Sequence, residues 1–225
     1  MRLLAIDAST FWGGVALLEV RDGAQKLVAE IGIEVEGSHA ARLLPLIEGL
    51  LATAGWSRSA LDAYAAVRGP GSFTGIRVAL GLMSGLALAA GRACVGVGTL
   101  HAMAEAHGAA AADRVPLLDA GRGDVYGARF DAGSSPPVEL REAWVGAPGL
   151  AVESGRALVV FGEGARVHES RLREAGYTGP IGRAATSVAA AAGRIALAHL
   201  ATGAVVAAAP APLYVRPASA KVRLR

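Results

Sequence analysis

The sequence predicts an α/β protein of two lobes, each a mixed β-sheet flanked by helices. In the first 106 residues, strand and helix patterns follow one another in the order βββαβαβα, and a second series of strands begins near residue 115. Apolar residues make up 53% of the chain, which is ample for a continuous core. We therefore place the lobes at residues 1–106 and 107–225.

The first lobe is predicted to open with three short strands joined by tight turns, a β-meander. The first helix follows Ser38, a suitable N-cap residue, carries apolar side chains at helical spacing and ends at Gly55. Buried strands and helices then alternate. The elements we expect are strands 2–6, 14–20, 26–35, 63–67 and 93–97, and helices 38–54, 72–90 and one from residue 99.

The second lobe is predicted to repeat the opening of the first. In both, a strand leads into a turn that bears an aspartate, Asp7 or Asp119, and a second strand follows. This duplication resembles the two-lobed actin-like plan (ASKHA, RNase H-like) shared by actin, sugar kinases and the Hsp70 ATPase. The elements we expect are strands 115–118, 125–130, 157–161 and 213–215, and helices 165–175 and 186–200.

The helix expected at 72–90 is apolar nearly all round, so it must be covered on two sides. Only 18% of the residues are charged, so part of the apolar surface is expected to be buried against a partner. Small residues at four-residue spacing, Gly81, Gly85 and Ala89, would let another helix approach closely. Together with helix 38–54, this helix is predicted to form a two-helix platform on which a second chain can dock. The side chains assigned to this interface are His39, Leu43, Leu46, Ile47, Leu50, Ile76, Leu80 and Met83. Leu80→Glu or Leu46→Glu is then expected to block association and to leave the fold intact.

A glycine-rich turn precedes the same helix, formed by Gly69, Pro70, Gly71, Ser72, Phe73, Thr74, Gly75 and Arg77. Its glycines permit positive φ and close backbone approach, and Ser72 can cap the helix. A phosphate site is the alternative, but no Gly-Lys-Ser/Thr follows, so a tight strand-to-helix turn is favoured. Pro70 excludes the Gly-x-Ser-x-Gly nucleophile elbow.

The remaining bulk features indicate a cytoplasmic chain without a membrane span. There is one cysteine, Cys94, and Asp7 interrupts the first apolar run too early for an export signal. The longest charge-free helical stretch, between Arg77 and Arg92, is too short to cross a bilayer. The basic end of the chain is compatible with binding to nucleic acid. A solvated tail is an equally good explanation, because no aromatic residue after Tyr214 lies between its charges to stack on bases. These basic residues are Arg216, Lys221, Arg223 and Arg225.

Several segments from end to end of the chain together resemble the TsaB (YeaZ) family, and the block at 68–77 is the most specific of them. The segments are 3–10, His39 with 43–45, 68–77, 119–126 and 213–216. The resemblance implies a non-catalytic subunit that pairs with its catalytic paralog TsaD. With the ATPase TsaE, it takes part in making N6-threonylcarbamoyladenosine at position 37 of tRNA. It further implies no cofactor of its own, ATP and metal on partner subunits, indirect contact with tRNA, and homodimers in isolation.

Two other functions are weighed on the same residues. An actin-like kinase or ATPase would use Asp7 and Asp119 as carboxylates facing Mg²⁺, but we favour a turn role for both. A metallopeptidase is disfavoured because Leu43 stands four residues after His39, where the catalytic paralog has a second histidine. His101 with Glu105 lacks a third ligand, so no metal site and no catalytic residue is predicted.

Overall fold

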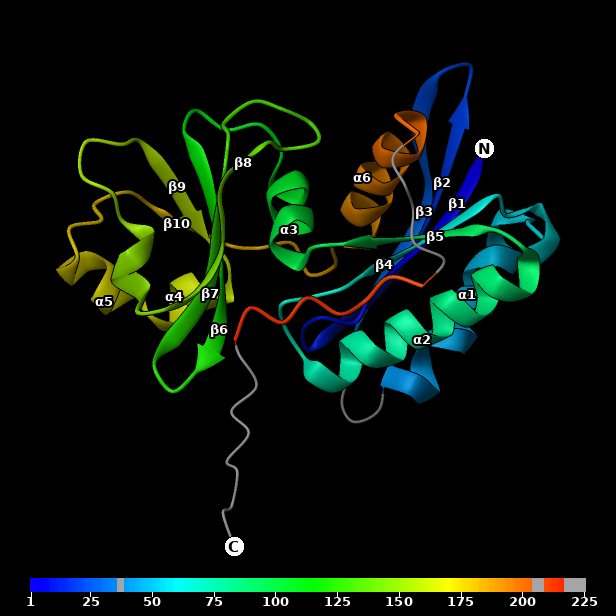
Figure 1. Cartoon of the computed structure of the whole chain (residues 1–225), viewed down its shortest axis with the longest axis horizontal. Coiled ribbons are helices and arrows are strands. Elements are labelled where there is room, and N and C mark those ends of the chain that lie inside the picture. Colours follow the sequence, from blue (N-terminus) through cyan, green and yellow to red (C-terminus); the bar gives the residue numbers. More distant parts are fainter. Residues whose placement is uncertain (36–38, 204–208, 217–225) are drawn as a thin grey trace, which may run out of the picture.

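Two five-stranded sheets form the two lobes of the computed structural model, which describes residues 1–35, 39–203 and 209–216 (Figure 1). The first sheet has the order β3-β2-β1-β4-β5. Strands β1, β2 and β3 form the predicted antiparallel meander, and β4 and β5 run parallel to β1. The strands are β1 (Arg2–Asp7), β2 (Trp12–Arg21), β3 (Ala24–Glu34), β4 (Ala63–Val67) and β5 (Ala93–Val97).

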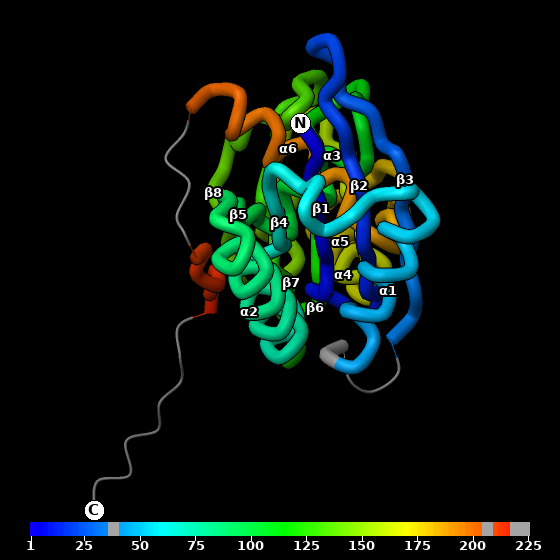
Figure 2. The backbone as a smooth tube through the Cα atoms, turned by 90° about the vertical axis from the view of Figure 1, so that its right-hand side faces the viewer, coloured from blue at the N-terminus to red at the C-terminus, as the bar shows by residue number. Residues whose placement is uncertain are grey.

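Helices cover both faces of the first sheet. On one face lie α1 (His39–Ala54) and α2 (Phe73–Ala90), side by side in both views (Figures 1 and 2). On the other lie α6 (Ala189–Ala201) and, beside it, α3 (Thr99–His107). Among the described helices, α2 alone is long and apolar enough to span a membrane. Its apolar side chains also cover the sheet, as expected for a core helix of a globular domain.

The second sheet has the order β10-β9-β6-β7-β8, and α3 packs against its β6 and β7. Helices α3 and α6 therefore lie between the two sheets, where they share one large apolar core (Figure 1). The strands are β6 (Asp113–Gly121), β7 (Asp124–Phe130), β8 (Glu139–Gly146), β9 (Leu158–Phe161) and β10 (Ile181–Gly182). The helices of this lobe are α4 (Glu163–Val167) and α5 (Glu169–Glu174); 3-10 turns lie at Arg58–Ala60 and Pro148–Ala151.

Helix α6 belongs to the first lobe, so the continuous second lobe predicted at 107–225 is corrected. Helix α6 packs across β1, β2, β4 and β5. Without it, the apolar face that includes Leu3, Ala5 and Leu18 would be bare on that side. An ideal Cβ at Gly193 would lie 2.3 Å from Leu18 Cδ1, so glycine is needed for this close approach.

Two expected elements differ from the structure, and two strands, β8 and β10, were not expected. Strand β8 was not predicted, because its Glu/Arg-rich first half lacks a clear apolar alternation. The single helix predicted at 165–175 is two short helices with a break at His168. The strand predicted at 213–215 joins neither sheet; instead, the Leu213 N–H donates to the Arg68 carbonyl at 2.7 Å.

A fully buried arginine, Arg114 on β6, ties α3 to the loop after β7. Its Nε donates to the Asp131 carbonyl at 2.7 Å, and Nη1 donates to the carbonyls of Ala104 and Gly108. Nη2 donates to the Ser134 carbonyl at 2.8 Å and to Asp131 Oδ1 at 3.3 Å. With every nitrogen of the guanidinium paired, its burial is compensated.

The environment of the Asp131 carboxylate leads us to expect that the stability of the fold decreases in acid. Burial acts to raise the pKa of Asp131, but hydrogen bonds from Ser134 and Val138 and the Arg114 guanidinium hold that pKa well below its usual range. A depressed folded pKa contributes stability that is fully present above the unfolded value, about 3.9, and is lost as the pH falls below it. Urea unfolding at pH 7 and pH 3 should therefore show a smaller acid loss for Asp131→Asn than for the wild type. Equal losses would contradict this assignment.

Candidate functional site

The glycine-rich turn packs its backbone directly on the turn between β1 and β2. The Ser72 N–H donates to the Ser9 carbonyl at 2.7 Å. An ideal Cβ at Gly71, where φ is 148°, would lie 2.1 Å from that same oxygen, and one at Gly75 would lie 2.0 Å from the Ala8 carbonyl. The glycines are thus required by backbone contact between the two turns.

The predicted cap of the following helix is confirmed. Ser72 is the N-cap of α2, and its Oγ accepts a hydrogen bond from the Gly75 N–H at 3.2 Å. Glycine packing and capping together account for the turn as a structural junction, the interpretation that the sequence favoured over a phosphate loop.

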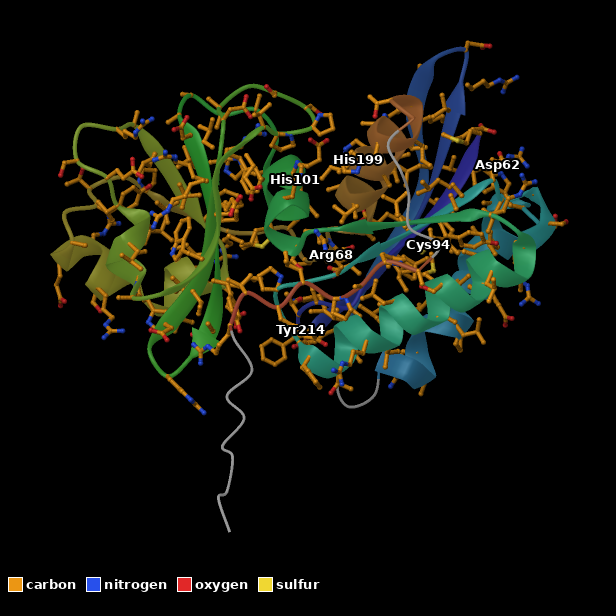
Figure 3. All side chains as sticks on the ribbon, in the orientation of Figure 1. Asp62, Arg68, Cys94, His101, His199 and Tyr214 are labelled. Atoms are coloured by element: carbon orange, nitrogen blue, oxygen red, sulfur yellow. The ribbon has the colours of Figure 1, made fainter. Side chains whose placement is uncertain are left out.

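The same turn also holds the C-terminal segment 209–216. An ideal Cβ at Gly69, where φ is 112°, would lie 2.7 Å from the Leu213 carbonyl. Arg77 Nε donates to the Tyr214 hydroxyl at 2.9 Å. Tyr214 lies beside the N-terminal end of α2, on the side where the lobes meet (Figure 3). The structure therefore joins two of the segments that carry the family resemblance, although 137 residues separate Arg77 from Tyr214.

A cleft between the lobes holds two adjoining cavities of about 340 and 590 Å³. Asp7 lines the first cavity and Asp119 lines the second. The residues that line both are Ser9, Thr10, Phe11, Leu118 and Glu163. The predicted pair of carboxylates thus lies in neighbouring parts of one cleft.

Asp7 is buried and engaged within the first lobe. Its Oδ1 accepts hydrogen bonds from the N–H and the hydroxyl of Ser9, at 2.8 and 2.7 Å. Its Oδ2 accepts from the Val188 N–H at 3.4 Å, at the start of α6. The Ser9 contacts are the turn role that the sequence favoured, whereas the contact across 181 positions had no signal in the sequence.

Asp119 is exposed and has partners in the second lobe. Its Oδ1 accepts from the Gly121 N–H at 3.3 Å and lies 2.9 Å from Nε2 of His168. The Gly121 contact is again the predicted turn role. Sequence analysis missed His168, which marks the break between α4 and α5.

Five of the eight side chains assigned to the partner interface are buried in the chain's own core, so their place in that assignment is corrected. They pack between the helices and the first sheet because the faces of α1 and α2 that bear them point toward it. Leu46 and Leu50 are half-buried, and the side chain of His39 lies outside the described residues. The five, each at most 5% exposed, are Leu43, Ile47, Ile76, Leu80 and Met83.

A different set of α2 residues faces outward. An added Cβ at Gly81 or Gly85 would meet nothing within 4 Å. Val78 and Leu82 are half-buried beside them, and Leu88 is 78% exposed. We call these five residues the α2 outer face. Its open part is formed by Gly81, Gly85 and Leu88, whereas Val78 and Leu82 also contact the core cluster and Val78 lines the larger cleft cavity. The sequence predicts such an apolar side for this helix, but on other residues.

No metal site is built by the described residues, in which no three histidine, cysteine or acidic side chains gather. Burial lowers the pKa of His101, the largest effect on that group, and its Nε2 has no hydrogen-bond partner. Glu105 accepts hydrogen bonds from Ser135 and from Arg194, on α6. Glu105, considered with His101 as a possible ligand, is thus already paired with Ser135 and Arg194.

Comparison with known proteins identifies relatives of this chain. A family profile described as "TsaD: tRNA N6-adenosine threonylcarbamoyltransferase" matches residues 33–135. The tRNA threonylcarbamoyladenosine biosynthesis protein TsaB of Escherichia coli is 41% identical over 132 residues, 58% of this chain and 55% of the relative. TsaB of Haemophilus influenzae is 38% identical over 130 residues, 56% of this chain and 52% of the relative. The matched region thus spans about half the length of these curated relatives.

The structural comparison extends over nearly the whole chain. A solved structure of YeaZ from Pseudomonas aeruginosa superposes with a TM-score of 0.80 at 28% identity, covering 95% of this chain and 99% of that one. This likeness and the two mixed sheets confirm the predicted fold of two α/β lobes, each a mixed sheet flanked by helices. In sequence and in structure, the chain is similar to proteins of the TsaB (YeaZ) family.

Proposed function

We propose that this chain is a non-catalytic subunit that pairs with a TsaD-like paralog and acts with a TsaE-like ATPase in the threonylcarbamoylation of adenosine 37 of tRNA. The observation that carries the proposal is the α2 outer face, an apolar helix surface that the described chain leaves open. The names of the curated relatives support the pathway, and the TsaD profile match supports a paralog of the same fold.

The α2 outer face suits a second helix of similar shape. No charged residue occurs from Val78 to Ala89, so a partner would desolvate no ion there. The glycines at 81 and 85 let two helix backbones approach closely, and Leu88 supplies apolar area at the end of the face. In isolation, two copies can bury the same surface symmetrically as a homodimer.

The hydrogen bonds of the two cleft aspartates support a role without chemistry of its own. Both carboxylates already serve turns of the fold, so we place ATP and metal on the partner subunits and contact with tRNA in the assembled complex. The lone buried cysteine, Cys94, supports a cytoplasmic location.

Gly85→Leu is expected to weaken pairing with the paralog at least tenfold, because the new side chain would hold the two helices apart. At concentrations where the wild type is monomeric, the variant should melt no earlier than the wild type, since leucine has the higher helix propensity and enters open space. Titration calorimetry with the purified TsaD-like paralog, and light scattering for the homodimer, measure the effect.

The matched control is Glu174→Leu, which adds an exposed leucine on α5 of the other lobe. It should pair like the wild type. Undiminished pairing of Gly85→Leu would refute the assigned surface. Magnesium-dependent protection of the chain by ATP against thermal unfolding would instead favour the kinase alternative through Asp7 and Asp119.

A further inference from the structure

An aromatic and cationic cluster stands on the surface at the N-terminal end of α2. The Arg77 guanidinium lies 3.8 Å from the ring centre of Phe73 and 5.9 Å from that of Tyr214. The two rings are 5.9 Å apart and inclined by 31°. Both remain more than half exposed, Phe73 at 57% and Tyr214 at 53%. We call these three residues the aromatic platform.

The platform presents hydrogen-bond donors in a fixed plane. Arg77 uses its Nε to reach the Tyr214 hydroxyl, and its two Nη groups have no hydrogen-bond or ion-pair partner among the described residues. A guanidinium packed on an aromatic ring loses little further freedom when it binds, and its planar donors match phosphate oxygens.

Contacts from both sides of the platform keep it in place. Phe73 follows Ser72, whose N–H is bonded to the Ser9 carbonyl. Tyr214 follows Leu213, whose N–H is bonded to the Arg68 carbonyl, and Arg216 forms an ion pair with Asp124 of β7 at 2.9 Å. The rings and the guanidinium are therefore preorganised by the fold, which reduces the entropy lost on binding.

These features suit single-stranded RNA as a ligand better than they suit a protein partner. Exposed rings beside a stacked arginine are what unpaired bases and their phosphates require. A protein partner covering Arg77 would have to supply a carboxylate to offset the desolvation of its charge. In the sequence, the residues from Arg216 onward include four basic and no acidic side chains, which more than account for the net charge of +3. A net positive charge on the chain favours a polyanion as ligand.

We propose that the aromatic platform binds single-stranded RNA directly, with Phe73 and Tyr214 stacking on unpaired bases and Arg77 contacting a phosphate. This goes beyond the proposed function, in which tRNA is reached through the assembled complex. It depends on that function only for the choice of RNA, a tRNA with its unpaired loop bases.

The test measures binding of an unmodified tRNA transcript by the full chain alone, by fluorescence anisotropy over a series of salt concentrations. Arg77→Ala should weaken binding about tenfold and reduce the slope of log K against log salt by about one. Phe73→Ala combined with Tyr214→Ala should weaken it by at least tenfold, and Arg77→Lys should restore the salt slope but not the full affinity. Melting curves establish that each variant is folded.

Arg92→Ala is the matched control, since it removes the same charge from an exposed site just beyond the other end of α2. The proposal is overturned if the platform variants lose no more affinity than Arg92→Ala, or if the wild-type chain does not bind the transcript at low salt. It is also overturned if folded variants lose affinity only for the paralog, which would make the platform a protein contact. Because the paralog is absent from the RNA measurement, failure here leaves the proposed pairing function standing.

Discussion

Leu80→Glu is expected to unfold the first lobe, not merely to block its association. Leu80 is 5% exposed and belongs to the core cluster between α2 and the sheet, with Ile6 and Met83. A carboxylate there would have neither water nor a cation, which costs about 3–5 kcal/mol in comparable cases. Because a domain of this size is stable by only about 5–15 kcal/mol, the thermal transition should fall sharply or disappear. Circular dichroism melting measures this directly.

Leu88→Glu is the matched variant on the same helix. Leu88 is 78% exposed, so its replacement desolvates no charge in the isolated chain, and the melting temperature should stay close to that of the wild type. Pairing with the paralog should nevertheless be lost if the α2 outer face is the interface. A folded Leu80→Glu chain with normal melting would show that this part of α2 is not core.

Gly75→Ala is expected to destabilise the chain by about 3 kcal/mol or more. The added methyl group would lie 2.0 Å from the Ala8 carbonyl oxygen and 3.2 Å from Ser72 Oγ. The first of these neighbours is backbone, so the turn between β1 and β2 would have to move away from α2. That movement would also weaken the bond from the Ser72 N–H to the Ser9 carbonyl. Urea unfolding of the wild type and of Gly75→Ala measures the difference in the free energy of unfolding.

Gly81→Ala separates this effect from helix propensity. It makes the same substitution in the same helix, but the new methyl group meets nothing within 4 Å. It should stabilise the isolated chain by about 0.5–1 kcal/mol. If Gly75→Ala were equally harmless, the junction of the two turns would be adaptable, and its glycines would need another explanation.

Local patterns were sufficient wherever one short segment determined its own structure. The bounds of β4 and β5 agree with the prediction at both ends, because each is a short apolar run bounded by turn residues. Ser72 was identified as an N-cap from its position before an apolar helical pattern. Strand β8 was not predicted by the same reasoning, because it forms by pairing with β7 and has no clear alternation of apolar and polar residues.

By itself, the sequence determined the α/β class, the two-lobed repeat, the resemblance to the TsaB (YeaZ) family and the existence of an apolar helix needing cover on two sides. Only the tertiary structure decided which side of α2 the sheet covers, that α6 returns to the first lobe, and that Tyr214 lies against Arg77. The physical reason is that apolar composition and spacing are local properties of a segment. The choice among apolar faces, and contacts between residues 137 apart, depend on how whole elements pack together.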